Sequence, residues 1–340
     1  MIYLITPEKA QYKANLHCHS TLSDGHRTPS ELKSMYKSHG YSILSITDHE
    51  RPYSHAALTD SDFIMITGYE CYIRPHPMGI YDRYNKEVHL NLFAREQENV
   101  KHICFNDRYA KYIKRDGALG SVVRAGSELP REFTVEYVNK YIQSARENGY
   151  LVAYNHPYWS MDDEARILAY EGLFSLEICN FGSFVASGIE HNGPLYDKML
   201  RTGRRIFCHA ADDNHNGLPE EHPGFDSFGA FTMIYPKEFT YSAIIDAMES
   251  GDMYASMGPV IRELAVDGDT LHIECSEAAR IFAYFGSKQP ASRHSTGEPI
   301  TSADLKIDRE ARYLRVAVQD ERGRWANTRG YFRREIGFQP

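Results

Sequence analysis

The stretch Ala14-Asn15-Leu16-His17-Cys18-His19 has the pattern of a β-strand that ends in two histidines one residue apart. Successive side chains of a strand point to opposite faces, so His17 and His19 share one face and Cys18 points away. Two imidazoles on one face of a rigid strand could chelate one metal ion. The pair alone is weak support, because 16 histidines in 340 residues give about 0.75 such pairs by chance.

Outward from this strand, the first two-thirds of the chain alternate short apolar runs with segments of helical period. This alternation is typical of β-α units and a mainly parallel sheet. The helix that starts at Thr28 is the clearest, because Thr28 can cap it, Pro29 suits its first turn and Glu31 completes a capping box. About seven or eight strands are expected before residue 255, which is enough for a barrel.

Two parts of the chain depart from this alternation. Residues 101–131 have poor periodicity and predict an irregular insertion over the surface. From about residue 256 the helix signal disappears and short strands alternate with turn residues. We therefore expect a metal-dependent barrel over residues 1–255 and a small all-β, β-sandwich-like appendage over residues 256–340.

Composition excludes several classes of protein. With 42% hydrophobic and 25% charged residues the chain should fold as a globular protein. The formal net charge of −8 opposes general nucleic-acid binding. No apolar run approaches the ~20 residues of a membrane helix and the first residues lack signal-peptide features, so a cytoplasmic location is expected. The six cysteines form no C-x-x-C pair, which argues against a disulfide framework or a thiolate zinc site.

Five polar clusters lie at or just after the carboxyl ends of expected strands, where parallel barrels carry their active sites. With His89, which alternates inward on its own strand, they supply nine candidate ligands: His17, His19, Asp24, His49, Glu70, His89, His156, Asp213 and His215. Imidazoles and carboxylates without thiolates suit zinc, manganese or iron. Nine ligands are too many for one ion, so two or three divalent ions are predicted, and paired metals commonly serve displacement at phosphorus.

The motifs resemble one known family and follow one another in its order across residues 14–216. They are Leu16-His17-Cys18-His19-Ser20-Thr21-Leu22-Ser23-Asp24-Gly25, Ile46-Thr47-Asp48-His49, Thr67-Gly68-Tyr69-Glu70, Val88-His89, Asn155-His156-Pro157 and Asp213-Asn214-His215. This set resembles the PHP (polymerase and histidinol phosphatase) superfamily of metal-dependent phosphoesterases. The resemblance implies an α/β fold, a distorted (β/α)7 barrel, with up to three metals in its mouth.

The resemblance also implies a division of the ligands into three sets. His17 and His19 would bind a first ion together with Asp213. Glu70 would bridge that ion to a second one, held by His89 and His156. Asp24, His49 and His215 would hold a third. Glu50 departs from the pattern, because the family more often has Asp after the Thr-Asp-His run.

Supporting roles fall to six further side chains near the expected mouth. They are Glu177 and His209 for orienting a ligand histidine, His191 and His222 for protonating a leaving group, and Arg51 and Lys86 for binding substrate phosphate. Each also has an ordinary alternative as a buried polar group, a core or loop histidine, or a solvated loop charge.

These residues predict a hydrolase of the phosphoric-ester class, acting on a small phosphorylated metabolite through a hydroxide held between two metals. One alternative is an amidohydrolase-like hydrolase of a non-phosphate bond, although such sites usually contain a bridging lysine and only Lys86 lies near the motifs. Another is a metal-stabilised binding module with a vestigial barrel, which the complete ligand set disfavours. The substrate, the choice between mono- and diester, and the oligomeric state stay open.

Overall fold

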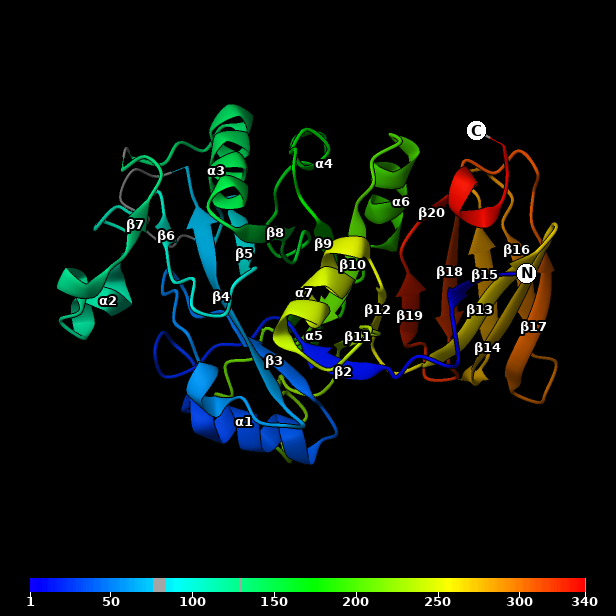
Figure 1. Ribbon diagram of the computed structural model, residues 1–340, viewed down its shortest axis with the longest axis horizontal. Helices are drawn as coiled ribbons and strands as arrows, with labels where there is room; N and C mark the ends of the chain where they lie inside the picture. The colour runs from blue at the N-terminus through cyan, green and yellow to red at the C-terminus, as the bar shows by residue number, and fades with distance from the viewer. Residues whose placement is uncertain (76–82, 129, 340) are drawn as a thin grey trace.

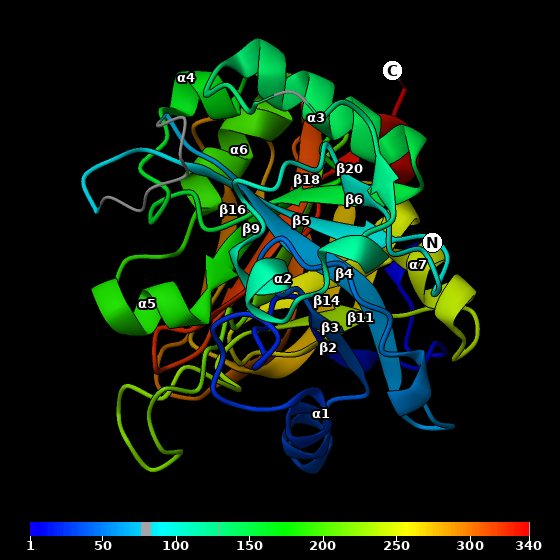
Figure 2. The same cartoon turned by 90° about the vertical axis from the view of Figure 1, so that its left-hand side faces the viewer.

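The computed structural model describes residues 1–75, 83–128 and 130–339. In Figure 1 the helices α3, α4 and α6 lie along one side of the strands and α1 lies on the opposite side. The view in Figure 2 again places α3 and α1 on opposite sides. The α-helices are α1 (Pro29–Ser38), α2 (Lys111–Arg115), α3 (Val135–Glu147), α4 (Glu164–Ile167), α5 (Phe181–Ser187), α6 (Gly193–Arg201) and α7 (Tyr241–Ser250). Short 3-10 helices span Ala56–Leu58, Leu119–Ser121 and Arg333–Ile336.

The strands before residue 256 alternate in part with these helices. They are β1 (Ile2–Ile5), β2 (Tyr12–Asn15), β3 (Ile43–Ile46), β4 (Ile64–Ile73), β5 (Val88–Ala94), β6 (His102–Ile103), β7 (Arg124–Ala125), β8 (Tyr150–Tyr154), β9 (Ser175–Asn180), β10 (Phe207–Ala211), β11 (Phe231–Ile234) and β12 (Met253–Ser256). The later strands are β13 (Ile261–Asp267), β14 (Thr270–Ala278), β15 (Arg280–Tyr284), β16 (Ala291–His294), β17 (Ile300–Lys306), β18 (Tyr313–Gln319), β19 (Trp325–Thr328) and β20 (Tyr331–Phe332).

The chain is mixed α/β, as predicted, but the predicted distorted (β/α)7 barrel is not confirmed, because the pairings of the described strands do not close the large sheet on itself. The large sheet is one continuous ladder in the order β10-β9-β8-β5-β4-β3-β2-β11-β12-β19-β18-β15-β16. Strand β5 runs antiparallel to both of its neighbours, β4 and β8, and β11 runs antiparallel to β2. Antiparallel neighbours need no crossover helix, so the regular β-α alternation breaks at these places.

The ladder curls enough to bring the segments after β2 and β10 together. His19 N–H donates to Asn214 O at 3.0 Å, and Asp213 N–H donates to His17 O at 2.9 Å. Two segments far apart in the sequence thus become neighbours at the carboxyl ends of their strands. This contact positions the histidine pair beside Asp213.

The large sheet runs across the predicted domain boundary at residue 255, because β12 pairs with β19. A second sheet has the order β1-β13-β14-β17, so the first strand of the chain pairs among the last ones. Both chain ends accordingly lie on the same side in Figure 1. The division into a barrel and a β-sandwich-like appendage stays a prediction.

Helix α1 forms as its sequence predicts. Glu31 N–H donates to Thr28 Oγ1, and Thr28 N–H donates to Glu31 Oε2 at 2.7 Å, which completes the capping box. The helix buries Leu32 and Tyr36 against the sheet. The Tyr36 hydroxyl lies 2.7 Å from Asn214 Oδ1 and so ties α1 to the segment after β10. Among the described residues, no helix combines the length and apolar character that crossing a membrane requires.

The predicted irregular insertion, residues 101–131, contains α2 and the short strand pair β6-β7. Arg115 at the end of α2 donates to the carbonyl oxygens of Thr21 and Ser23, both at 2.9 Å. The insertion is therefore attached to the loop that follows the histidine pair. That attachment brings α2 to the functional site.

Candidate metal centre

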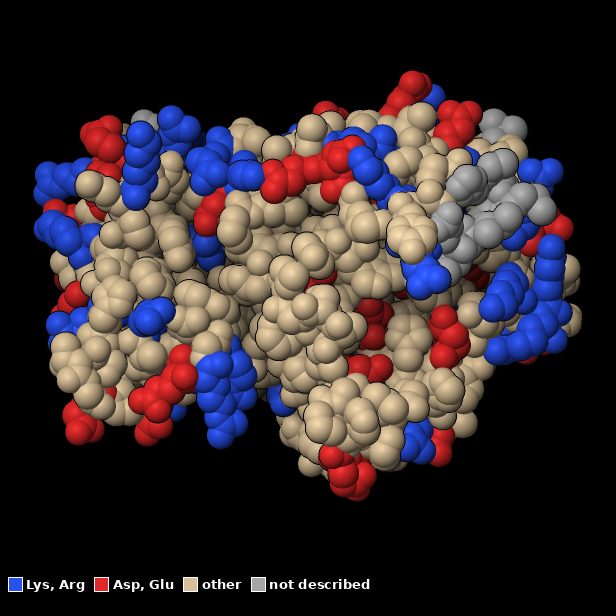
Figure 3. All heavy atoms as spheres, turned by 180° about the vertical axis from the view of Figure 1, so that it is seen from behind, with Lys and Arg blue, Asp and Glu red and all other residues tan. Residues whose placement is uncertain are grey.

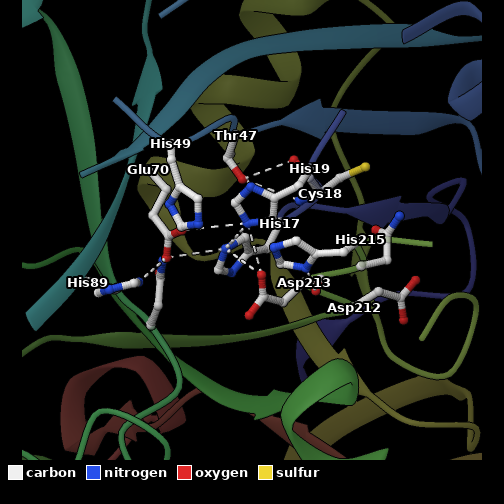
Figure 4. Close-up of polar contacts among 12 residues, drawn as sticks. His17, Cys18, His19, Thr47, His49, Glu70, His89, Asp212, Asp213 and His215 are labelled. Carbon is white, nitrogen blue, oxygen red and sulfur yellow. Dashed lines mark hydrogen bonds and ion pairs between the residues drawn. The ribbon is translucent and has the colours of Figure 1, made fainter. Parts of the chain in front are cut away.

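The nine predicted ligands converge on one place, at the carboxyl ends of β2, β3, β8 and β10 and on the inner face of β4 and β5. Figure 4 shows seven of these side chains turned toward one another, whereas Cys18 points away; the seven are His17, His19, His49, Glu70, His89, Asp213 and His215. Ligand atoms within 4.8 Å of one another define four overlapping groups. The groups are His19, Asp24, His49 and His215; His17, Glu70 and His156; His17, His19 and Asp213; and His49, Glu70 and His89.

Glu70 occupies the middle of this cluster and is fully buried. Its Oε1 lies 3.0 Å from His89 Nδ1 and 3.3 Å from both His17 Nε2 and His156 Nε2. Its Oε2 lies 2.9 Å from His49 Nδ1. A single carboxylate thus contacts four imidazoles that come from four different segments of the chain.

The backbone turns sharply where the strands deliver two of these side chains. His156, just after β8, has φ of 25°, and Asp213, just after β10, has φ of 52°. Such left-handed conformations are uncommon for residues other than glycine, and they cluster at functional sites. The turns direct both side chains into the cluster.

The residues fit divalent cations. His19 Nδ1 is buried without a hydrogen-bond partner among the described residues, and Glu70 Oε2 and His49 Nδ1 lie 2.9 Å apart as an ion pair without hydrogen-bond geometry. A buried polar atom without a partner is costly, so lone pairs that converge in this way favour a bound cation. Imidazole and carboxylate donors suit zinc, manganese or iron.

Electrostatics keeps the central carboxylate ionised. Burial raises the pKa of Glu70, but His89, His17 and His49 outweigh burial and hold that pKa well below its ordinary value. Burial, aided by the neighbouring His215 and His49, lowers the pKa of His19. Burial lowers the pKa of His49 and His89 as well, but Glu70 outweighs burial and raises both pKa values, so a bound cation would have to displace these protons.

A cavity of about 470 Å³ opens above the cluster. Of the nine predicted ligands, the fully buried His17 and His19 alone are missing from its lining. Five other side chains complete the wall: Tyr72, Arg74, Lys111, Tyr112 and Trp159. The volume accommodates a small organic phosphate.

The chain resembles PHP-like metal-dependent phosphoesterases. A structure from Bacteroides vulgatus, described as a two-domain protein containing a "predicted PHP-like metal-dependent phosphoesterase", is 14% identical with a TM-score of 0.46, over 97% of this chain and 89% of its own. One from Bifidobacterium adolescentis, described provisionally as a metal-dependent phosphoesterase, is 18% identical with a TM-score of 0.37, over 63% of this chain and 93% of its own.

A third structure, described as an amidohydrolase from Chromobacterium violaceum with bound sulfate and no metal, is 14% identical with a TM-score of 0.39, over 59% of this chain and 87% of its own. Comparisons with protein-family models and with curated proteins found no match.

Glu177 lies directly behind the metal-ligand cluster and is fully buried. Its Oε1 is 3.0 Å from His17 Nδ1, and its Oε2 accepts the backbone N–H of His156 at 2.8 Å. One carboxylate therefore orients two predicted ligands, which is the geometry that the predicted supporting role needs. His209 lies one step farther out, 3.9 Å from Glu177 Oε1, and burial lowers its pKa to about 4.

The structure does not bring the two predicted proton donors to the cavity. His191 is stacked on Trp325 with ring centroids 5.4 Å apart, and its Nε2 lies 3.3 Å from Asn327 Nδ2. His222 is exposed and its Nδ1 accepts the backbone N–H of Gly224 at 2.9 Å. Neither side chain lines the cavity above the cluster.

Arg51 and Lys86 also lie outside the cavity lining. Arg51 pairs with Asp116 of the insertion, and Lys86 Nζ lies 2.6 Å from Asp163 Oδ2. The basic residues in the lining are instead Arg74 and Lys111. Sequence reasoning missed both.

A signal for Arg74 was available, because Glu70 and Arg74 are four residues apart at the end of β4 and alternate residues of a strand share a face. No comparable signal marks Lys111. It begins α2 inside the segment of poor periodicity, so its place depends on long-range contacts.

Proposed function

We propose that the protein is a metal-dependent phosphoesterase that hydrolyses a small phosphorylated metabolite. The observation that carries this proposal is Glu70 in contact with four histidines inside a cluster that contains all nine candidate ligands. When bound, two or three zinc, manganese or iron ions would lower the pKa of water and offset charge on the phosphate oxygens.

The residues divide into three holding sets. His17, His19 and Asp213 would hold one ion, and His89 and His156 would hold a second, with Glu70 shared between the two. Asp24, His49 and His215 would hold the third. Glu177 would fix the rotation of the His17 ring, since its carboxylate lies 3.0 Å from His17 Nδ1. Most of the ligands lie on strands or just after their carboxyl ends, whereas Asp24 lies in the loop after β2.

The two basic residues of the lining favour an anionic substrate. Arg74 is held beside Glu87, and Lys111 projects from α2 at the cavity. The exposed face in Figure 3 has basic and acidic side chains interspersed, with acidic ones inside a hollow. A non-phosphate hydrolase of the amidohydrolase type usually has a bridging lysine, whereas the lysine in this lining, Lys111, belongs to α2 and is not one of the nine candidate ligands.

Metal analysis and a generic substrate test this proposal. The purified protein should contain at least two divalent ions per chain and should hydrolyse an aryl phosphate when manganese is added. Protein treated with a chelator provides the matched control and should regain activity with manganese. Cleavage of carboxylic esters or amides, with no phosphoester cleaved, would contradict the proposal.

Lys111 provides a prediction about substrate binding. It lines the cavity and has no acidic partner among the described residues. Replacing Lys111 by methionine should raise KM for an aryl phosphate by about tenfold, because a hydrogen bond to a charged group is lost. The value of kcat should change little, and Lys111→Arg should restore KM.

Lys114 on the same helix is the control for Lys111. Its ammonium lies 3.3 Å from Asp107 and it does not line the cavity. Lys114→Met should leave both kinetic constants unchanged. Equal effects of the two substitutions would mean that net charge, and not position, determines KM.

A further inference from the structure

A second cavity, of about 540 Å³, lies beside the one above the metal cluster. The two cavities share a single wall residue, Trp159. Much of the second lining is apolar or aromatic: Pro157, Tyr158, Trp159, Met161, Ile167 and Leu195. A group bound in the second cavity would therefore lie one side chain away from the proposed reaction site.

The Trp159 ring packs against the rings of two predicted metal ligands, His156 and His89. Its ring centroid lies 4.8 Å from that of His156 and 5.2 Å from that of His89, with edge-to-face geometry. The indole is nevertheless 39% exposed, and its neighbours Tyr158 and Met161 are 49% and 44% exposed. Large apolar side chains that stay open to solvent at a functional site often mark a ligand surface.

The carboxylate of Glu190 fixes the backbone of the segment that carries these side chains. The backbone N–H groups of Tyr158 and Trp159 each donate to a different oxygen of Glu190, both at 3.0 Å. Glu190 is fully buried and also accepts from Asn192 Nδ2 at 2.7 Å. The aromatic surface is thus preformed, which reduces the entropy that binding would cost.

The charges around the second cavity are largely compensated. Each carboxylate in the lining has a basic partner: Glu87 has Arg74, Asp162 has Arg166 at 2.7 Å, and Glu164 has Lys198. The basic residue of the lining is Arg83, whose guanidinium carbon lies 5.5 Å from the centroid of the Tyr84 ring. This pattern suits an uncharged group better than a second phosphate.

We propose that the second cavity binds the leaving alcohol of the phosphoester and prefers an alcohol that carries an uncharged planar ring. The inference rests on the proposed function. In the reaction, the phosphorus-oxygen bond to the alcohol breaks and one to the oxygen of water forms. A proton from water ends on the alcohol, so ester and water give alcohol and phosphate.

Two esters that differ by one ring test the inference. Benzyl phosphate and ethyl phosphate both release alkoxides, so their kcat/KM values compare the ring and not the leaving-group chemistry. Met161→Glu places a charge in the second cavity, and Met161 does not line the cavity above the metal cluster. This substitution should lower kcat/KM for benzyl phosphate about tenfold and change kcat/KM for ethyl phosphate much less.

Phe184→Ala is the matched control, because Phe184 is also an exposed aromatic residue but lines neither cavity. Phe184→Ala should leave kcat/KM unchanged for both esters. Calorimetry with benzylphosphonate and ethylphosphonate, which are not hydrolysed, measures the same preference as a binding constant. Met161→Glu should weaken the binding of benzylphosphonate about tenfold and should change the binding of ethylphosphonate little.

The outcomes separate this inference from the proposed function. If both esters are hydrolysed and Met161→Glu lowers the two kcat/KM values equally or not at all, the inference of a ring-binding cavity is wrong and the proposed phosphoesterase function is retained. If neither ester is hydrolysed, but benzylphosphonate binds more tightly than ethylphosphonate and Met161→Glu removes that difference, the proposed phosphoesterase function is wrong and the inference of a ring-binding cavity is retained.

Discussion

Glu70→Gln should empty the metal centre and lower the turnover of an aryl phosphate by about a thousandfold. The reason is the position of Glu70, whose two oxygens lie within 3.3 Å of His17, His49, His89 and His156. Glutamine keeps the shape of the side chain but loses the charge and one acceptor oxygen. Elemental analysis should show fewer ions per chain, and steady-state assays with saturating manganese should show the loss.

Glu249→Gln is the control for this substitution. Glu249 is an exposed glutamate that pairs with Arg95, outside the metal cluster. Its replacement should leave metal content and turnover unchanged, and circular dichroism should show both variants folded. A Glu70→Gln protein with full metal content and full turnover would contradict a bridging role for Glu70.

The candidate ligands could be predicted because each is encoded locally. His156 and Asp213 follow short apolar runs that form β8 and β10, and strand period alone puts His17 and His19 on one face. Such local patterns can be recognised in the sequence without knowledge of the tertiary structure. The spatial convergence of these residues then follows from the carboxyl-end rule for parallel strands.

The direction of strand β5 could not be predicted in this way. The run that forms β5 indicates a buried strand, but nothing in it specifies direction, and β5 proves antiparallel to both neighbours. Direction depends on how the connection from β4 returns to the sheet. The predicted parallel barrel therefore failed at this strand, whereas the inward position of His89 is independent of direction.

Arg51 shows a different limit of sequence reasoning. It follows the Thr-Asp-His motif directly, yet its guanidinium pairs with Asp116, 65 residues later in the chain. Lys111, from the same insertion, takes a place at the cavity instead. Proximity in sequence could not indicate Lys111, because the insertion is positioned by long-range contacts.

Those contacts centre on Glu50, the residue that departs from the family pattern. Glu50 has φ of 54° and is buried. Arg131 Nη1 and Nη2 donate to its two oxygens at 2.5 and 2.7 Å, and Tyr72 N–H donates to Oε1 at 3.0 Å. Burial raises the pKa of Glu50, but Arg131 outweighs burial and lowers that pKa to about 2. The pair links the insertion to the residue after His49.

Arg131→Met should lower the free energy of unfolding by about 3–5 kcal/mol, because it leaves the carboxylate of Glu50 buried without its partner. Urea unfolding at pH 7 measures the change. Arg124→Met is the matched control in the same insertion, since Arg124 forms an exposed pair with Glu128 at 3.2 Å. That substitution should cost less than about 1 kcal/mol.

The double substitution Glu50→Gln with Arg131→Met separates the buried charge from the packing of the insertion. Removing both charges should recover part of the lost stability, because no ion is then buried unpaired. If the insertion positions Lys111 through this pair, Arg131→Met should also raise KM for an aryl phosphate in the same direction as Lys111→Met. A stable Arg131→Met protein with unchanged KM would show that the Arg115 contacts to the loop after β2 suffice to hold α2 at the cavity.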